Sequence, residues 1–212
     1  MSSTVQLSTK AVVTKTEIRE ALFTDTSEVN RTDDELNTLY NFVNWVSEGI
    51  ESFVGQPIIQ KTVVEYNDGG GEYIFLTTLP VVLVSAVTEN GIALVSGTDY
   101  IYDPDLVAVR RLSENDPLSA SIFKAGTMAT RVVYTAGYGT QVRDGANELT
   151  SVTSVPEDFK LATYVWVQNL WEKGPANYSP EQGNATGSRA AIPYAVKEIL
   201  RNRVLQVHWI GS

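Results

Sequence analysis

Few residues in this chain could perform chemistry. It has no cysteine, and its one histidine, His208, is four residues from the C-terminal end. The absence of cysteine excludes thiol catalysis, disulfides and thiolate metal sites. A lone histidine near a terminus supports neither a Ser-His-Asp triad nor a multi-histidine metal site. We therefore predict no catalytic, metal-binding or cofactor-binding residues, no cofactor, and no enzymatic activity.

Three short motifs are similar to binding sites but have structural explanations. Gly69-Gly70-Gly71 is followed by Glu72 and a strand, whereas a phosphate loop needs a Lys-Ser/Thr pair entering a helix, so a hairpin turn is the better interpretation. Asp103 and Asp105 flank a turn proline, and a calcium loop requires more oxygen ligands at fixed spacing. Helix capping explains the acidic run Asp33-Asp34-Glu35.

The formal net charge of the chain is −9. This balance argues against wrapping around nucleic acid, which needs a basic face. It does not argue against letting DNA pass, because a negative wall repels phosphates. The longest apolar-rich run, around Val81–Val87, is far shorter than the roughly 20 residues of a membrane helix, so no membrane partner is expected.

Helical patterns occur on both sides of a β-rich region. Thr32 and Glu35 are spaced as a capping box at the start of an amphipathic helix that ends before Gly55. A shorter helix is expected over Lys15–Phe23. Two C-terminal helices are expected, one from Pro156 to Lys173 and one from Pro193 through Leu205. Trp166 and Trp171 on the first of these are interpreted as core or subunit-interface residues rather than base-stacking residues.

Between these helices, about residues 58–139 form the predicted β region. Asn90-Gly91 is the strongest hairpin signal, because it suits the positive φ angles of a type I′ turn. Residues 140–154 are predicted to be a polar loop. The expected strands cover Ile58–Tyr66, Tyr73–Leu76, Val81–Thr88, Ile92–Val95, Asp99–Tyr102, Val107–Leu112 and Thr130–Thr135.

The element order predicts an α+β fold with a helical core and an inserted, mainly antiparallel β block. The core would comprise the long N-terminal helix and the two C-terminal helices. Residues 1–13 are predicted to be a flexible arm and residues 14–212 a single domain. The Gly/Asn/Ser-rich stretch 174–188 is predicted to be a flexible loop that orders on binding a partner.

Three ordered segments resemble the head–tail connector (adaptor) family of tailed phages. The first is the capped helix, which ends with Ile50-Glu51-Ser52-Phe53-Val54-Gly55. The second is a strand that runs into the glycine corner Gly137-Tyr138-Gly139, over Val132–Gly139. The third is the start of a helix, Val155–Ala162. The order and spacing resemble the family over roughly residues 14–205. The chain departs from it at Gln56, where a basic residue is common, in the stretch 140–154, and in its larger β block.

The resemblance implies a structural virion protein at the head–tail junction, assembled in the host cytoplasm. Copies would form a ring, of about twelve, beneath the portal protein. That ring would extend the DNA channel, with DNA only as passing cargo, and present a docking surface for a tail or stopper protein.

The apolar C-terminal segment is the expected docking element on the portal or on a neighbouring copy. Its candidate residues are Val204, Leu205, Val207, Trp209 and Ile210. The alternative, that the segment packs on its own domain, stays open. Two other functions also stay open: another neck or tail-completion protein, and a non-catalytic α+β module that binds a small molecule or sugar. Tyr66, Tyr73, Tyr100 and Tyr102 would line the ligand site of such a module.

Overall fold

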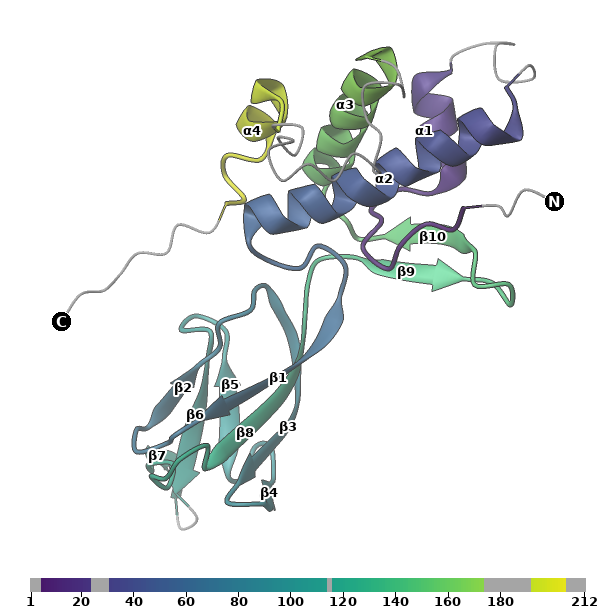
Figure 1. Cartoon of the computed structure of the whole chain (residues 1–212). Helices are drawn as coiled ribbons and strands as arrows, with labels where there is room; N and C mark the ends of the chain where they lie inside the picture. Colours follow the sequence, from purple (N-terminus) through teal and green to yellow (C-terminus); the bar gives the residue numbers. More distant parts are fainter. Residues whose placement is uncertain (1–4, 24–30, 114–115, 174–191, 205–212) are drawn as a thin grey trace. The chain divides into compact units, whose positions relative to one another are not determined.

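The computed structural model describes residues 5–23, 31–113, 116–173 and 192–204. The chain divides into two compact units. The first unit comprises Met1–Ile59 and Gly139–Ser212, and the second comprises Gln60–Tyr138 (Figure 1). Within the described residues, no helix is both long enough and apolar enough to span a membrane.

Four helices belong to the first unit: α1 (Lys15–Leu22), α2 (Asp33–Val54), α3 (Glu157–Lys173) and α4 (Tyr194–Ile199). Helix α3 is central, since it contacts each of the other three helices. The buried side chains of these helices are mainly apolar. They include Ile18, Leu39, Val43, Val46, Ile50, Phe159, Ala162, Val167, Leu170 and Val196.

Helix α2 begins at a capping box. Thr32 Oγ1 accepts a hydrogen bond from the backbone N–H of Glu35 (3.3 Å). In return, Glu35 Oε2 accepts one from the backbone N–H of Thr32 (2.9 Å). These reciprocal bonds satisfy backbone donors that the first helical turn leaves unpaired. Thr14 and Glu17 form the same arrangement at the start of α1.

The last helix is shorter than expected. The sequence predicts a helix from Pro193 through Leu205, whereas α4 ends at Ile199 and turns follow up to Val204. Arg203 holds this end of the described chain, because its Nε lies 2.6 Å from Asp158 Oδ2 at the start of α3. The ion pair therefore connects two helix termini that lie far apart in the sequence.

The stretch 140–154 contains a hairpin, and its prediction as a loop was wrong. Strand β9 (Thr140–Arg143) pairs antiparallel with β10 (Leu149–Thr153). Leu149 and Val152 are buried, and they are the only two aliphatic side chains of β10. With so few apolar residues the stretch has no clear alternation of polar and apolar positions, which is the usual sequence signal of a strand.

Residues 5–13 also differ from the expected loose arm. Leu7, Ala11, Val12 and Val13 are at most 2% exposed. The backbone of the segment is bonded to side chains of other elements, for example Ser8 N–H to Asn44 Oδ1 at 2.7 Å. Burial of these aliphatic side chains gives the segment a share in the core of the first unit.

The second unit contains two antiparallel sheets (Figure 1). One has the order β1 (Lys61–Asn67), β8 (Thr130–Ala136), β3 (Val81–Glu89), β4 (Ile92–Leu94). The other has the order β2 (Tyr73–Phe75), β6 (Ala108–Ser113), β5 (Tyr100–Asp103), and β7 (Asp116–Ala120) pairs with β6. The expected α+β class with antiparallel pairing is confirmed.

A shared core lies between these two sheets. Along β8, burial alternates strictly, so that Thr130, Val132, Tyr134 and Ala136 face inward. Ile74 of β2 and Val109 of β6 are opposite each other in register and belong to the same buried cluster. The alternate residues of each strand therefore point outward, as the period of two in a strand requires.

The sequence predicts hairpin turns at two places in the second unit, and one of these predictions is confirmed. Asn90 (φ 49°) and Gly91 (φ 80°) join β3 to β4, as a type I′ turn requires. Gly69-Gly70-Gly71 is not a hairpin turn, because β1 and β2 belong to different sheets. The glycine run instead bonds to a distant loop, for example Gly70 N–H to Phe123 O at 2.8 Å. Strand β7 is not among the strands that the sequence predicts.

Candidate assembly surfaces

The described part of the chain contains no candidate metal site. Searching those residues for three or more His, Cys, Asp or Glu that could hold a metal ion gives no group. His208 lies outside the described residues. Two networks of buried or partly buried ionisable groups have structural roles in the second unit.

The first network joins the two sheets of the second unit. Glu89 on β3 is 4% exposed and Arg111 on β6 is 8% exposed. Arg111 Nε lies 3.9 Å from Glu89 Oε1, while Arg111 Nη1 donates to the backbone oxygens of Asp99 (2.6 Å) and Leu112 (3.0 Å). Glu89 also accepts from the backbone N–H of Lys124 (2.8 Å). Both charges are thus compensated where water is excluded.

The second network surrounds the Tyr134 hydroxyl. It donates to Glu65 on β1 and accepts from the backbone N–H of Thr78 (3.1 Å). Burial and the bond to Glu65 raise the pKa of Tyr134, so the hydroxyl stays neutral at physiological pH. Glu65 also accepts from Thr77 Oγ1 (2.6 Å). The network fixes the segment that leads from one sheet to the other.

A shallow pocket of about 450 Å³ lies at the N-terminal end of α2. Arg31 is its one cation, and the guanidinium already has partners on several sides. Its carbon lies 4.9 Å from the ring centre of Phe23 and 5.4 Å from that of Trp171. Glu35 Oε1 is 3.3 Å from Nη1. The pocket is also lined by the carboxylates of Asp34 and Glu35. Because these would repel an anion, the pocket is not an anion site.

The tryptophans of α3 pack inside the first unit. Trp166 is 3% exposed and its ring lies 5.9 Å from that of Trp45. Trp171 meets Phe23 edge to face at 5.8 Å. These contacts agree with the core interpretation and leave no stacked surface for bases on α3.

Large apolar side chains are exposed mainly on the second unit. Of the fourteen exposed large hydrophobic residues in the described part of the chain, eleven lie between residues 60 and 138. Single exposed hydrophobic residues need no explanation, but a concentration on one unit favours an interaction surface.

One group of them lies on the outer surface of the β1–β8–β3 sheet, and we call it the Val64 face. It consists of Val64, Tyr66, Leu83 and Val133, with Arg131 at one end. The register places Val64 opposite Val133 and Tyr66 opposite Arg131. Val64, Tyr66 and Leu83 are 43%, 56% and 60% exposed. The outward positions of the three strands include no carboxylate.

A second group lies on the outer surface of the β2–β6–β5 sheet, and we call it the Phe75 face. It consists of Tyr73, Phe75, Ile101, Arg110 and Asp103. The rings of Tyr73 and Phe75 are stacked with centres 6.3 Å apart. Arg110 lies over Tyr73 at 5.9 Å and pairs with Glu72 at 2.6 Å. Phe75 is 61% exposed.

The four tyrosines proposed to line a ligand site do not come together. Tyr66 is on the Val64 face and Tyr73 is on the Phe75 face. Tyr100 is 3% exposed and belongs to the core. Tyr102 packs against that core, because it faces inward with Tyr100. This arrangement removes the feature on which the small-molecule alternative depended.

Of the candidate docking residues, the structure describes one. Val204 is partly buried just beyond α4, next to the anchored Arg203. Leu205, Val207, Trp209 and Ile210 lie outside the described residues, as does the stretch 174–188. Their docking role stays a prediction.

Comparison with protein-family models and with curated proteins finds no match. Solved structures do match. A chain of the virion of the native gene transfer agent (GTA) particle has 18% identity and a TM-score of 0.56, covering 99% of this chain and 97% of that chain. A neck chain of the empty GTA particle, computed with C6 symmetry, has 16% identity and a TM-score of 0.56, with coverage of 95% and 93%.

A neck chain of the native GTA particle, computed with C12 symmetry, has 17% identity and a TM-score of 0.53, covering 96% of this chain and 94% of that chain. At these identities the matches establish the fold. The resemblance noted on the three sequence segments is confirmed at that level, since the chain has the fold of chains from a phage-like particle neck.

Proposed function

We propose that this protein is a structural, non-enzymatic subunit of the neck of a tailed-phage or phage-like particle. Copies form a ring, of about twelve, beneath the portal. The ring joins the capsid to a tail or stopper protein and extends the channel through which DNA passes.

The observation that carries this proposal is the extent of the structural match. The GTA virion match covers 99% of this chain and 97% of the other. Both units of this protein therefore have counterparts in one subunit of a particle. A shared helix pair or sheet alone would be weak support, because common motifs serve many functions.

Charge and surface character are compatible with the proposal. A net charge of −9 disfavours tight DNA binding, so that DNA can move past the protein. Exposed apolar faces on the second unit suit contacts with other proteins. The matched neck chains come from particles treated with C6 and C12 symmetry, which supports a cyclic assembly here.

The test is electron microscopy of portal-containing heads that lack this protein, before and after its addition. The expected result is an added ring of density at the portal, with copies related by rotation about the channel. Heads that remain unchanged at saturating protein would contradict the proposal. A single asymmetric copy would contradict the ring.

A further inference from the structure

The Val64 face and the Phe75 face lie on opposite sides of the same unit. Each belongs to one of the two sheets, and the shared core separates them. Leu83 and Phe75 project from the two outer surfaces with nearly equal exposure, 60% and 61%. The unit thus has an apolar surface on both sides.

Two different faces on one molecule are what a cyclic assembly needs. A ring is closed by heterologous contacts, in which one patch of each copy meets a different patch of the next. A two-fold dimer would need only one self-complementary patch. Because every copy carries a net charge of −9, copies approach most favourably where a positively charged surface of one meets a negatively charged surface of the next.

The charges at the two faces are complementary. On the Val64 face, Arg131 is a cation with no ion-pair partner among the described residues. The Phe75 face has Arg110, which Glu72 neutralises, and the further carboxylate of Asp103. Asp103 Oδ1 accepts backbone N–H groups of Asp105 and Leu106, and its charge adds to that of Glu72 in raising the pKa of Arg110. The Val64 face therefore has one cation and no carboxylate, whereas at the Phe75 face two carboxylates, Glu72 and Asp103, surround one cation.

We propose that the second unit forms a copy-to-copy contact of the ring, in which the Val64 face of one copy packs on the Phe75 face of the next. This inference rests on the proposed neck function and specifies the surfaces that build it. The Tyr73–Phe75 stack supplies the aromatic anchor that interface centres favour. Arg131 of one copy approaches the Asp103 edge of its neighbour.

The size of the contact sets its strength. Three strands about 4.8 Å apart, each about 23 Å long, give a face of roughly 300 Å². A stable interface buries about 800 Å² per partner, so this contact supplies less than half of what a lasting ring needs. The contact therefore forms when the portal holds several copies side by side, because this raises the effective concentration of each copy near its neighbours.

Cross-linking on assembled heads tests the contact. The chain has no cysteine, so introduced thiols are the only ones on this protein. A double variant, Leu83→Cys with Phe75→Cys, is bound to portal-containing heads and treated with a bifunctional maleimide. The matched control pairs Leu83→Cys with Ile122→Cys, whose side chain is 65% exposed in a loop of the same unit. Each single variant is treated in the same way.

The expected result is a ladder of multimers for the Leu83/Phe75 pair and no ladder for the control pair. Bound heads without a ladder, or an equal ladder from the control pair, would overturn the face-to-face contact and leave the neck function intact. Dimers from Leu83→Cys alone would also overturn it, because they require a two-fold contact. Wild-type protein that fails to join heads refutes the neck function itself, and this inference with it.

A charge placed in either face gives an independent measurement. Leu83→Asp and Phe75→Asp should each lower the occupancy of heads at least about tenfold, since each buries an unpaired charge in the contact. Ile122→Asp should change it less than about twofold. Circular dichroism of each variant shows whether the fold is kept. Equal occupancy for folded Leu83→Asp, Phe75→Asp and wild type would overturn the contact.

Discussion

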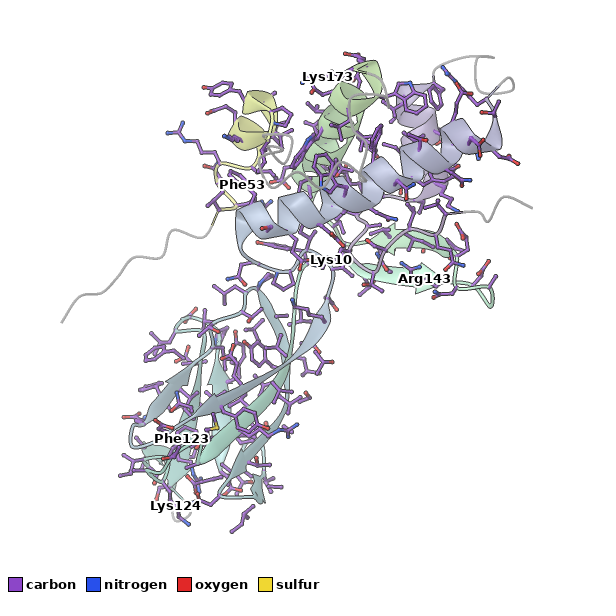
Figure 2. All side chains as sticks on the ribbon, viewed as in Figure 1. Lys10, Phe53, Phe123, Lys124, Arg143 and Lys173 are labelled. Atoms are coloured by element: carbon purple, nitrogen blue, oxygen red, sulfur yellow. The ribbon has the colours of Figure 1, made fainter. Side chains whose placement is uncertain are left out.

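Arg143 on β9, labelled in Figure 2, donates a hydrogen bond from Nη2 to the backbone oxygen of Ser8 at 2.8 Å. The same nitrogen lies 2.9 Å from the oxygen of Leu7, and Nη1 donates to Asn147 O at 2.9 Å. One guanidinium thus binds the N-terminal segment to the β9–β10 hairpin. Its five donors in a fixed plane allow several carbonyls to be satisfied at once.

Replacing this guanidinium should destabilise the protein. Arg143→Ala is expected to lower the free energy of unfolding by about 2 kcal/mol, because it removes charge-assisted bonds to the backbone oxygens of Leu7, Ser8 and Asn147. Denaturant unfolding measures the change. The control is Arg201→Ala, an exposed position, for which the change should stay within about 0.5 kcal/mol. Equal stability of the two variants would mean that the N-terminal segment is not held by Arg143.

Gly139, in the glycine corner, should not tolerate a side chain. An added Cβ would lie 2.2 Å from Val155 Cγ2 and 2.7 Å from the backbone oxygen of Thr153. Gly139→Ala is therefore expected to cost about 1–3 kcal/mol of stability. At Gly145 no atom lies within 4 Å of the added Cβ, and Gly145→Ala should be neutral or stabilise by about 0.5 kcal/mol. Thermal unfolding distinguishes the two; a neutral Gly139→Ala would contradict the packing.

The charge of Glu17 should stabilise the fold in a pH-dependent way. Burial acts to raise its pKa, but hydrogen bonds from Lys160 and from the Thr14 cap outweigh this and hold the pKa below its usual value. The pKa of Glu17 is lower in the folded state than in the unfolded chain. Its ionised carboxylate therefore makes its full contribution to the free energy of unfolding at neutral pH. This contribution is lost as pH falls through the folded pKa, from about pH 5 downward.

The check is Glu17→Gln, which keeps a side chain suited to a capping box. Its destabilisation relative to wild type should be clear at pH 7 and should shrink as the solution is acidified toward pH ~3. Glu20→Gln, at an exposed position of the same helix, serves as the comparison. A difference for Glu17→Gln that is constant with pH would show that the ion pair with Lys160 does not contribute through charge.

Removal of residues 205–212 should abolish docking and leave the folded structure stable. The Arg203–Asp158 pair at 2.6 Å remains in the truncated protein, so its thermal unfolding should match that of the full chain within a few degrees. We expect it to fail to join portal-containing heads, because the apolar docking residues Leu205, Val207, Trp209 and Ile210 are lost. Sedimentation of heads with bound protein measures this. Normal joining by the truncated protein would exclude the segment as the docking element.

The features that the sequence alone predicts correctly are those that depend on interactions between residues close together in the chain. The start of α2 follows from the Thr32–Glu35 capping box and its end from Gly55. The β3–β4 hairpin follows from Asn90-Gly91. Each of these signals involves residues a few positions apart. The lack of cysteine and the single terminal histidine already argued against a catalytic set. The ordered segments of the capped helix and the glycine corner indicated the fold that the GTA neck chains share.

Only the tertiary structure decided how distant segments combine. In the structure, β1 and β2 belong to different sheets, residues 140–154 contain a hairpin, and residues 5–13 contribute buried side chains to the core of the first unit. These outcomes depend on contacts with other segments of the chain, such as β8 for β1 and Arg143 for Ser8, and no local pattern encodes those contacts. The two apolar faces could not be predicted either. Which side of a strand points outward depends on the register with its neighbouring strands and on the sheet that covers its other side.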